Sequence, residues 1–152
     1  MSKIFSYYEN NVDYAWYDSS NVKYSELEDH DDKLKTLRVV FNNGAQYEYK
    51  DVDVMQYLKF REDLSQGKAL NKYIKSQDYE YSKLEEANLD DINERLKDVY
   101  GWLFIRNTDD GFDLVNATNE VQYHRDEKLS ESEIELVKGI IDKLMNKKVI
   151  VM

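Results

Sequence analysis

The sequence contains no cysteine and no proline, and it has five glycines and two histidines. Without cysteine, disulfide bonds, zinc–thiolate sites and thiol catalysis are excluded. Without proline, the turns depend on Gly, Asn, Asp and Ser. The N-terminal stretch MSKIFSYYENN lacks the apolar core of a signal peptide, and no run approaches the roughly 18 apolar residues of a membrane span. We therefore expect a cytoplasmic protein without membrane contacts.

Basic residues are fewer than acidic ones. The chain has 21 Lys and Arg against 31 Asp and Glu, which gives a formal net charge of −10. Proteins that grip the phosphate backbone of nucleic acids usually present a basic face. The excess of acidic residues therefore favours a basic protein or a nucleoprotein as the macromolecular partner. The alternative is that the acidic surface only keeps the protein soluble.

Tyrosine is abundant, with 13 tyrosines against five phenylalanines. A tyrosine ring covers apolar surface while its hydroxyl keeps a polar contact, so tyrosines suit half-buried sheet faces and interfaces. We favour sheet-face tyrosines over a dedicated aromatic binding platform. With 41% hydrophobic residues, a chain of 152 residues can bury a core without a metal or a disulfide.

The N-terminal half is predicted to contain β-hairpins followed by short helices. Residues 12–27 indicate a strand, a Ser-Ser-Asn turn and a second strand. Residues 34–50 alternate apolar and polar side chains around an Asn-Gly turn, which is typical of a tight hairpin. Asp53 is a candidate N-cap for a helix over residues 54–65, and residues 68–75 predict a further short helix.

The C-terminal half combines helices with a second set of strands. A polar linker at 76–87 precedes an amphipathic helix at 88–99. Ser130 and Glu133 form a capping-box pattern at the start of a long amphipathic helix, and the apolar tail after it indicates an edge strand. Three strands are expected between these helices, at 102–106, 112–115 and 118–123.

These elements predict an α+β fold, with a small antiparallel sheet of β-hairpins packed with helices and a long amphipathic helix near the C-terminus. We expect two units. Residues 1–80 form an α+β unit. Residues 81–152 form a helix–β-hairpin–helix unit that either packs with the first as one body or stands apart from it.

An ordered set of residues within 16–75 matches a known pattern. Its members are Ser19, Ser20, Asn21, Val22, Thr36, Leu37, Val39, Phe41, Asn43, Gly44, Tyr47, Tyr49, Val52, Tyr57, Ser65, Gly67, Asn71, Ile74 and Lys75. The segment resembles the KTSC domain, a small module appended to the C-terminus of some bacterial lysyl-tRNA synthetases. The resemblance implies a compact α+β module, found alone or fused in bacterial and phage proteins. The synthetase fusion suggests an association with nucleic acid.

Two features depart from the family pattern. Asp53 stands where the family usually has a proline, and the segment between Val22 and Thr36 is longer and more acidic. An inserted loop at this point is either a partner contact or tolerated surface. Residues 81–152 resemble no family known to us.

No residues in the sequence form a recognisable catalytic or metal centre. His30 lies in the contiguous run Asp29–Asp32, whose side chains cannot all point one way, and His124 has no partner fixed by the sequence. The aspartates around Gly111 lack the bidentate glutamate of a calcium loop and predict a hairpin turn. We therefore expect a non-enzymatic protein without catalytic residues, cofactor or metal.

Our leading hypothesis is a non-enzymatic protein that binds a macromolecule. Its composition and the distribution of the resembling family suggest a phage or mobile-element inhibitor of a host factor, of the anti-defence or anti-CRISPR type, acting in the cytoplasm of a bacterial host. The contact would use the tyrosine-rich surface and an acidic loop. The loop residues are Glu26, Glu28, Asp29, Asp31 and Asp32.

The alternative hypothesis is an RNA- or DNA-binding accessory module. In single-stranded nucleic acid binding, aromatic rings stack on bases and lysines contact phosphates. The same tyrosines belong to the hairpin alternation, so a purely structural role in the core is a further interpretation. The candidate edge consists of Tyr47, Tyr49, Tyr57, Lys68, Asn71, Lys72 and Lys75.

Overall fold

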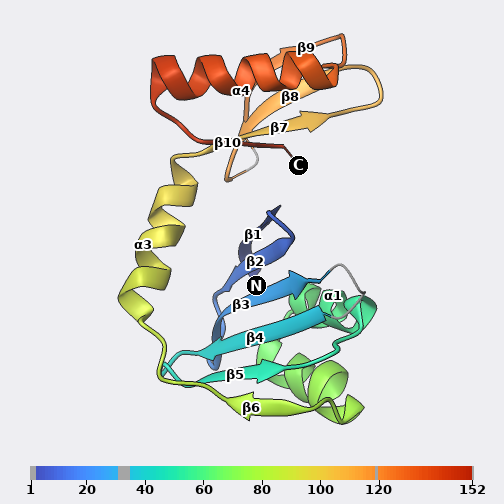
Figure 1. The fold of residues 1–152 in the computed structure, drawn as a ribbon, viewed down its shortest axis with the longest axis vertical. Coiled ribbons are helices and arrows are strands. Elements are labelled where there is room, and N and C mark those ends of the chain that lie inside the picture. The colour runs from blue at the N-terminus through green and yellow to red at the C-terminus, as the bar shows by residue number, and fades with distance from the viewer. Residues whose placement is uncertain (1–2, 31–34, 119, 152) are drawn as a thin grey trace. The chain divides into compact units, whose positions relative to one another are not determined.

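The computed structural model describes residues 3–30, 35–118 and 120–151. The chain divides into two compact units, Met1–Ile92 and Asn93–Met152, with the boundary inside helix α3 (Leu89–Tyr100). The fold is α+β, as the sequence predicts. It combines a six-stranded antiparallel sheet with a four-stranded mixed sheet (Figure 1).

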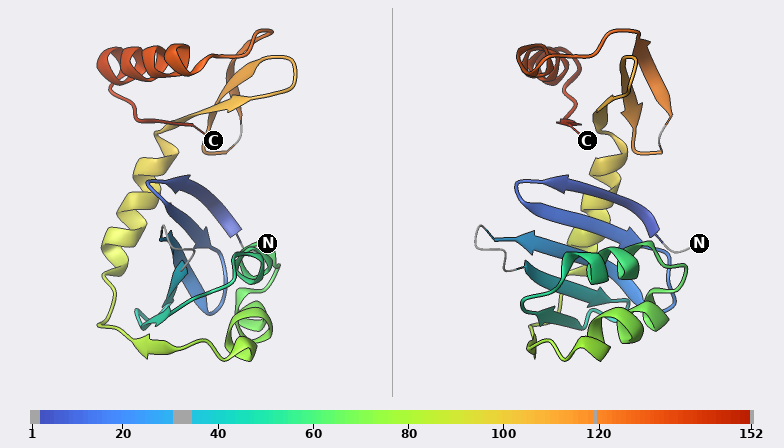
Figure 2. Two further views of the ribbon diagram at one scale, coloured as in Figure 1. Left: turned by 45° about the vertical axis from the view of Figure 1, so that its right-hand side comes forward. Right: turned by 90° about the vertical axis from the view of Figure 1, so that its right-hand side faces the viewer.

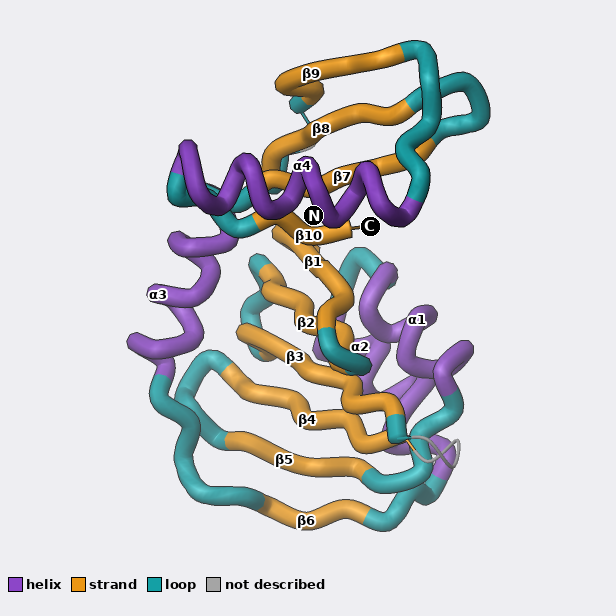
Figure 3. Tube along the Cα trace, turned by 45° about the horizontal axis from the view of Figure 1, so that its top comes forward, coloured by secondary structure: helices purple, strands orange, loops and turns teal. Residues whose placement is uncertain are grey.

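Six strands of the first unit lie side by side in chain order (Figure 3). They are β1 (Lys3–Glu9), β2 (Val12–Tyr17), β3 (Val22–Asp29), β4 (Lys35–Phe41), β5 (Gln46–Tyr49) and β6 (Tyr81–Lys83). Each neighbouring pair is antiparallel. The hairpins predicted at 12–27 and 34–50 are confirmed as β2–β3 and β4–β5.

Two strands of this sheet, β1 and β6, are not predicted from the sequence. β1 pairs with β2 across a turn in which Asn10 and Asn11 have φ of 53° and 65°, the positive values that a two-residue hairpin turn needs. β6 lies within residues 76–87, so the prediction of a linker there is wrong. Its residues are exposed and form one edge of the sheet, which explains their polar character.

Helical segments cover one face of the six-stranded sheet (Figure 2). They are α1 (Val54–Glu62), α2 (Gln66–Ala69), the π-helical segment η1 (Leu70–Ile74) and the 3-10 segment η2 (Lys75–Gln77). Asp53 caps α1 as predicted. Its carboxylate accepts hydrogen bonds from the backbone N–H groups of Met55 at 2.8 Å and Gln56 at 3.4 Å.

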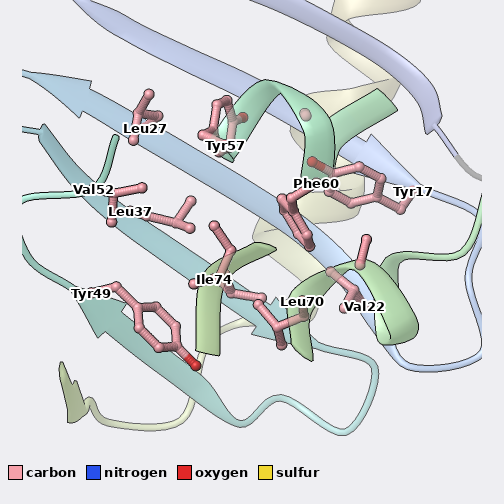
Figure 4. Close-up of a cluster of buried hydrophobic side chains, with 13 residues drawn as sticks. Tyr17, Val22, Leu27, Leu37, Tyr49, Val52, Tyr57, Phe60, Leu70 and Ile74 are labelled. Carbon is pink, nitrogen blue, oxygen red and sulfur yellow. The ribbon is translucent and has the colours of Figure 1, made fainter. Parts of the chain in front are cut away.

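The core of the first unit lies between these helices and alternate residues of the strands. In the β4–β5 hairpin, Leu37 pairs with Tyr49 and Val39 with Tyr47, so the four side chains share the helix-covered face. Burying one such side chain contributes about 1.5–3 kcal/mol. Figure 4 shows the cluster, whose buried members are Ala15, Tyr17, Val22, Leu27, Leu37, Val39, Tyr49, Val52, Tyr57, Phe60, Ala69, Leu70 and Ile74.

The second unit contains the four-stranded sheet, in the order β10-β7-β8-β9. Its strands are β7 (Leu103–Asn107), β8 (Phe112–Asn116), β9 (Val121–Arg125) and β10 (Val149–Val151). β10 is the predicted edge strand and pairs in parallel with β7, whereas the other pairs are antiparallel. The predicted turn around Gly111 joins β7 to β8.

The long helix α4 (Glu131–Met145) packs on this sheet and begins at the predicted capping box. The N–H of Glu133 donates to Ser130 Oγ at 3.3 Å, and the N–H of Ser130 donates to Glu133 Oε1 at 3.1 Å. Ile141 is buried against the sheet, whereas Leu144 is 78% exposed. Among the described residues, no helix is long and apolar enough to cross a bilayer.

Candidate binding pocket

A pocket of about 880 Å³ opens in the first unit, where β4, β5 and β6 meet the end of the helical segment. Tyr47 and Tyr49 both line it because alternate residues of β5 face the same side. Tyr81 pairs with Tyr49 in the β5–β6 ladder and adds a ring from the edge strand. The aromatic lining residues are Phe41, Tyr47, Tyr49, Tyr79 and Tyr81.

Contacts within the unit hold this aromatic wall. Phe41 packs edge-on against Tyr47, with ring centroids 5.8 Å apart, and Tyr49 lies 5.8 Å from Tyr81. The hydroxyl of Tyr79 accepts a hydrogen bond from the backbone N–H of Asp53 at 3.1 Å. This bond ties the segment before β6 to the start of α1, so the rings are oriented by the fold itself.

Tyr49 is the most buried tyrosine of the wall, at 4% exposure. None of the hydrogen bonds among the described residues engages its hydroxyl. Figure 4 shows this hydroxyl at the border of the core cluster, on the side away from Tyr57 and Phe60. Burial raises the pKa of the Tyr49 hydroxyl, and the neighbouring Tyr47 and Tyr81 raise it further. The neutral hydroxyl is therefore available to a ligand both as a donor and as an acceptor.

Further lining residues come from the β2–β3 turn and from the β4–β5 turn. The side-chain amide of Asn42 donates to the backbone carbonyl of Ser19 at 2.8 Å, and its N–H donates to the carbonyl of Asn21 at 2.8 Å. Gly67 lies against this turn so closely that a Cβ there would stand 2.6 Å from Asn21 Nδ2. A glycine at this position lets α2 approach the turn that carries the lining residues Ser20 and Asn21.

Two charged side chains, Lys75 and Asp78, complete the lining at the end of the helical segment. Asp78 closes η2 in the left-handed conformation, with φ 54° and ψ 35°. Both residues are exposed, and none of the described hydrogen bonds or ion pairs engages either charged group. The pocket therefore offers a cation and an anion to a ligand.

A row of lysines lies beside the pocket. Residues 64–77 contain Lys68, Lys72 and Lys75 and no acidic residue, in a chain of net charge −10. All three are exposed and lie on successive turns of the helical segment. On the strand side, Lys83 Nζ lies 6.0 Å from the ring centroid of Tyr47. Four lysines thus lie at or beside the pocket, whose lining also contains Asp78.

The structure brings together only part of the edge predicted from the sequence. Tyr47, Tyr49 and Lys75 line the pocket. Lys68 and Lys72 are exposed beside it on α2 and η1, as is Asn71, but they do not form its walls.

Tyr57 does not belong to this edge, because it is completely buried in the core. Its hydroxyl donates to Asp13 Oδ1 at 2.8 Å and lies 3.3 Å from Ser25 Oγ, which in turn lies 2.8 Å from the hydroxyl of Tyr17. Arg61 donates to the other carboxylate oxygen of Asp13 at 2.7 Å. Burial raises the pKa of Tyr57 well above its ordinary value, so the hydroxyl stays neutral. Tyr57 is part of the scaffold and cannot stack on a ligand.

Sequence reasoning missed most of the lining residues, among them Phe41, Asp78, Tyr79 and Tyr81. A signal for two of them was present, because Tyr79-Glu80-Tyr81 repeats the Tyr-x-Tyr spacing of residues 47–49. This signal was not used because residues 76–87 were interpreted as a linker.

The acidic loop predicted to contact a basic partner is largely engaged within the sheet. Glu26 accepts a hydrogen bond from the hydroxyl of Tyr24 at 2.6 Å and pairs with Arg38 at 3.3 Å. Asp29 forms an ion pair with Lys35. Glu28 is exposed on β3, and the other two predicted contacts, Asp31 and Asp32, lie outside the described residues.

His124, the histidine of the second unit, lies between two carboxylates. Its Nδ1 is 2.6 Å from Asp113 Oδ1, and its Nε2 is 2.8 Å from Asp126 Oδ1. Arg106 donates to the other oxygen of Asp113 at 3.0 Å. The hydrogen bonds to these carboxylates raise the pKa of His124, and the bond from His124 lowers the pKa of Asp113. With both nitrogens engaged, the ring has none free to activate a nucleophile.

The remaining histidine and the aspartates around Gly111 also have local partners. His30 Nε2 lies 3.1 Å from Thr36 Oγ1, and Asp110 accepts from the Thr108 hydroxyl at 3.1 Å. Within the described parts of the chain, no group of three or more His, Asp or Glu side chains is arranged to hold a metal ion.

Residues 18–85 match the family model of the KTSC domain. No curated protein and no solved structure matches the chain. The matched segment is slightly less than half of the chain and includes every residue that lines the pocket. It also extends the resemblance seen in the sequence through β6, whose pairing with β5 places Tyr81 in the site. The chain therefore contains a KTSC domain at residues 18–85.

Proposed function

We propose that the protein is a non-enzymatic binder of single-stranded nucleic acid, RNA or DNA. The observation that carries this proposal is an aromatic pocket beside a lysine row that is free of acidic residues. Of the two hypotheses drawn from the sequence, this geometry favours the alternative one.

The aromatic wall supplies stacking surfaces. Tyr81 is 64% exposed and Tyr47 is half-buried, so both rings are open to a base, whereas Phe41 and Tyr49 support them from behind. Every base has a flat π-face, and stacking on an aromatic side chain is worth about 1–3 kcal/mol per base. A volume of about 880 Å³ is in the range of small-molecule sites and accommodates a base with its sugar.

The lysine row supplies phosphate contacts. Lys68, Lys72 and Lys75 present ammonium groups along one segment, and a flexible single strand can follow such a row away from the pocket. The overall acidity does not oppose this, because a Debye length of about 8 Å at physiological salt screens the distant charges. Contacts with the lysine row are therefore expected to matter more than the net charge of the chain.

The experiment is a fluorescence-anisotropy titration of the full chain with a labelled single-stranded oligonucleotide of about 12 nucleotides. Reversal of the lysine row in K68E/K72E/K75E is expected to abolish binding. The matched control K128E/K143E/K147E makes the same charge change on exposed lysines of the second unit and is expected to retain it. Equal losses in both variants, or no loss in either, would contradict the proposal.

Salt dependence provides a second readout. Three phosphate contacts to a single strand give a slope of about −2 in a plot of log K against log salt concentration. Wild-type binding that does not change between about 50 and about 200 mM salt would argue against phosphate contacts.

A second candidate is inhibition of a host factor, with a phage or mobile-element origin and an anti-defence or anti-CRISPR role. The net charge of −10 and the exposed Glu28 support it. Under this candidate, E28K weakens capture of a basic protein from a bacterial lysate, with or without nuclease, and leaves oligonucleotide affinity unchanged. Capture that is lost only after nuclease treatment favours the nucleic-acid proposal instead.

A further inference from the structure

Asp78 is the one carboxylate among the described residues that line the pocket. Its backbone is left-handed because it closes η2, a conformation that is common at helix ends and that aspartate tolerates. Its side chain is exposed and none of the described hydrogen bonds or ion pairs engages it. A carboxylate repels phosphate, so Asp78 itself is suited to contact a base rather than a phosphate.

An ionised carboxylate is a hydrogen-bond acceptor with two oxygens and no donor. A ligand group that matches it must therefore present two donors side by side. The hydroxyl of Tyr49, which none of the described hydrogen bonds engages, is a donor in the same pocket. The site thus combines a paired acceptor, a donor and aromatic rings for stacking.

The four bases differ in what their Watson–Crick edges present. Guanine has two adjacent donors, N1–H and the 2-amino group, followed by the acceptor O6. Adenine and cytosine each place a ring-nitrogen acceptor beside the amino group, which would face a carboxylate oxygen without a proton. Uracil has a single N3–H between two carbonyl acceptors. Guanine alone matches the carboxylate at both oxygens, and single-stranded recognition commonly reads this edge.

We propose that the pocket selects guanine from single-stranded nucleic acid. The carboxylate of Asp78 accepts from N1–H and from the 2-amino group, the Tyr49 hydroxyl donates to O6, and the rings of Tyr47 and Tyr81 stack on the base. This selectivity rests on the proposed function, because it assigns the base that the same pocket takes.

The test compares oligouridines of about 12 nucleotides in which one central base is guanine, inosine, adenine, cytosine or uracil. The full chain is expected to bind the guanine oligonucleotide at least about fivefold more tightly than the adenine, cytosine and uracil ones, the lower end of what a bidentate contact gives. Inosine lacks the 2-amino group and keeps one of the two donors, so its affinity is expected to be intermediate.

Two matched variants assign the selectivity to a residue. D78N keeps a residue type that tolerates left-handed backbone but replaces one acceptor by a donor, so it is expected to lose the preference for guanine and retain binding of oligouridine. D51N makes the same change at Asp51, an exposed aspartate with φ 57° that does not line the pocket, and is expected to keep the preference.

Each failure has its own signature. If none of the five oligonucleotides binds, the proposed function is wrong and the selectivity falls with it. If all five bind equally, nucleic-acid binding stands and the guanine proposal is overturned. A guanine preference that survives in D78N overturns the role of Asp78. The series on the wild-type chain tests the proposal even if a variant fails to fold.

Discussion

The hydroxyl of Tyr57 donates a hydrogen bond to Oδ1 of Asp13 at 2.8 Å, and this bond joins α1 to β2 beneath the helical layer. Arg61, one turn further along α1, holds the other oxygen of Asp13 at 2.7 Å. A tyrosine that sequence reasoning places at a binding edge is therefore a scaffold residue. The distinction between Tyr57 and the pocket tyrosines leads to the first prediction.

Tyr57→Phe is expected to lower the free energy of unfolding by about 1–3 kcal/mol, because Asp13 and Ser25 lose a buried hydrogen-bond partner. Urea denaturation followed by circular dichroism measures the change. Oligonucleotide affinity of the folded variant is expected to equal that of the wild type. Unchanged stability together with lost binding would place Tyr57 in the site after all.

Tyr81→Ala is expected to show the reverse pattern. The ring is 64% exposed, so its removal costs little stability, but it deletes a stacking surface worth about 1–3 kcal/mol of binding free energy. Tyr123→Ala is the matched control, since that ring is 54% exposed in the second unit. Anisotropy titrations measure the oligonucleotide affinity of both variants. An equal loss of affinity in the two variants would contradict the assignment of the pocket.

Gly67→Ala tests the close approach of α2 to the β2–β3 turn. The new Cβ would stand 2.6 Å from Asn21 Nδ2, so the side-chain amide of Asn21, a residue that lines the pocket, must move. We expect weaker oligonucleotide binding. A large loss of stability is not expected, because alanine favours helix by about 0.5–1 kcal/mol over glycine.

Gly139→Ala in α4 is the control for this substitution. Nothing lies within 4 Å of the added Cβ, so the variant is expected to be more stable by about 0.5–1 kcal/mol and to bind normally. Thermal unfolding and anisotropy of both variants give the comparison. Normal binding by Gly67→Ala would mean that the pocket does not depend on this approach.

The stability of the β8–β9 pair is expected to depend on pH through His124. Asp113 and Asp126 raise the pKa of His124 above that of the unfolded chain, about 6.5. The stabilisation is therefore fully present below pH of about 6.5 and is lost as the pH rises through the folded pKa. The lowered pKa of Asp113 acts at the acidic end, where its contribution is lost as the pH falls through the folded value.

Hydrogen exchange at the amides of β8 and β9 between pH of about 5.5 and about 8.5, corrected for intrinsic exchange, measures the His124 contribution. Protection is expected to fall with rising pH in the wild type. His124→Gln keeps a polar side chain without a charge and is expected to remove that dependence. The same slope in both proteins would show that His124 is not its source.

The sequence predicts the elements whose signals are local. Asp53 caps α1 because its carboxylate accepts hydrogen bonds from the first backbone N–H groups of the helix. The Asn-Gly turn forms a hairpin because Gly44, at φ 91°, adopts the left-handed backbone conformation without strain. The capping box at Ser130 is equally local. Each of these predictions depends on a few neighbouring residues, and the structure confirms each.

The pocket depends on strand pairing that the sequence signals only weakly. Tyr81 lies beside Tyr49 because β6 pairs with β5, and the local signal for this short exposed edge strand is limited to the Tyr-x-Tyr spacing of residues 79–81. The sequence does not distinguish the roles of Tyr57 and Tyr49. The packing of α1 on the sheet buries Tyr57 in the core and leaves the hydroxyl of Tyr49 at the pocket. Contacts between residues far apart in the sequence therefore decide which tyrosines line the pocket and which belong to the core.

The most direct measurement of where a ligand binds is an NMR titration of the isotope-labelled full chain with a single-stranded oligonucleotide of about 12 nucleotides. Nucleic-acid binding at the pocket predicts chemical-shift changes that cluster on Phe41, Tyr47, Tyr49, Lys75 and Tyr81. Changes confined to β3 around Glu28 or to the second unit, or a spectrum unaffected by the oligonucleotide, would contradict it.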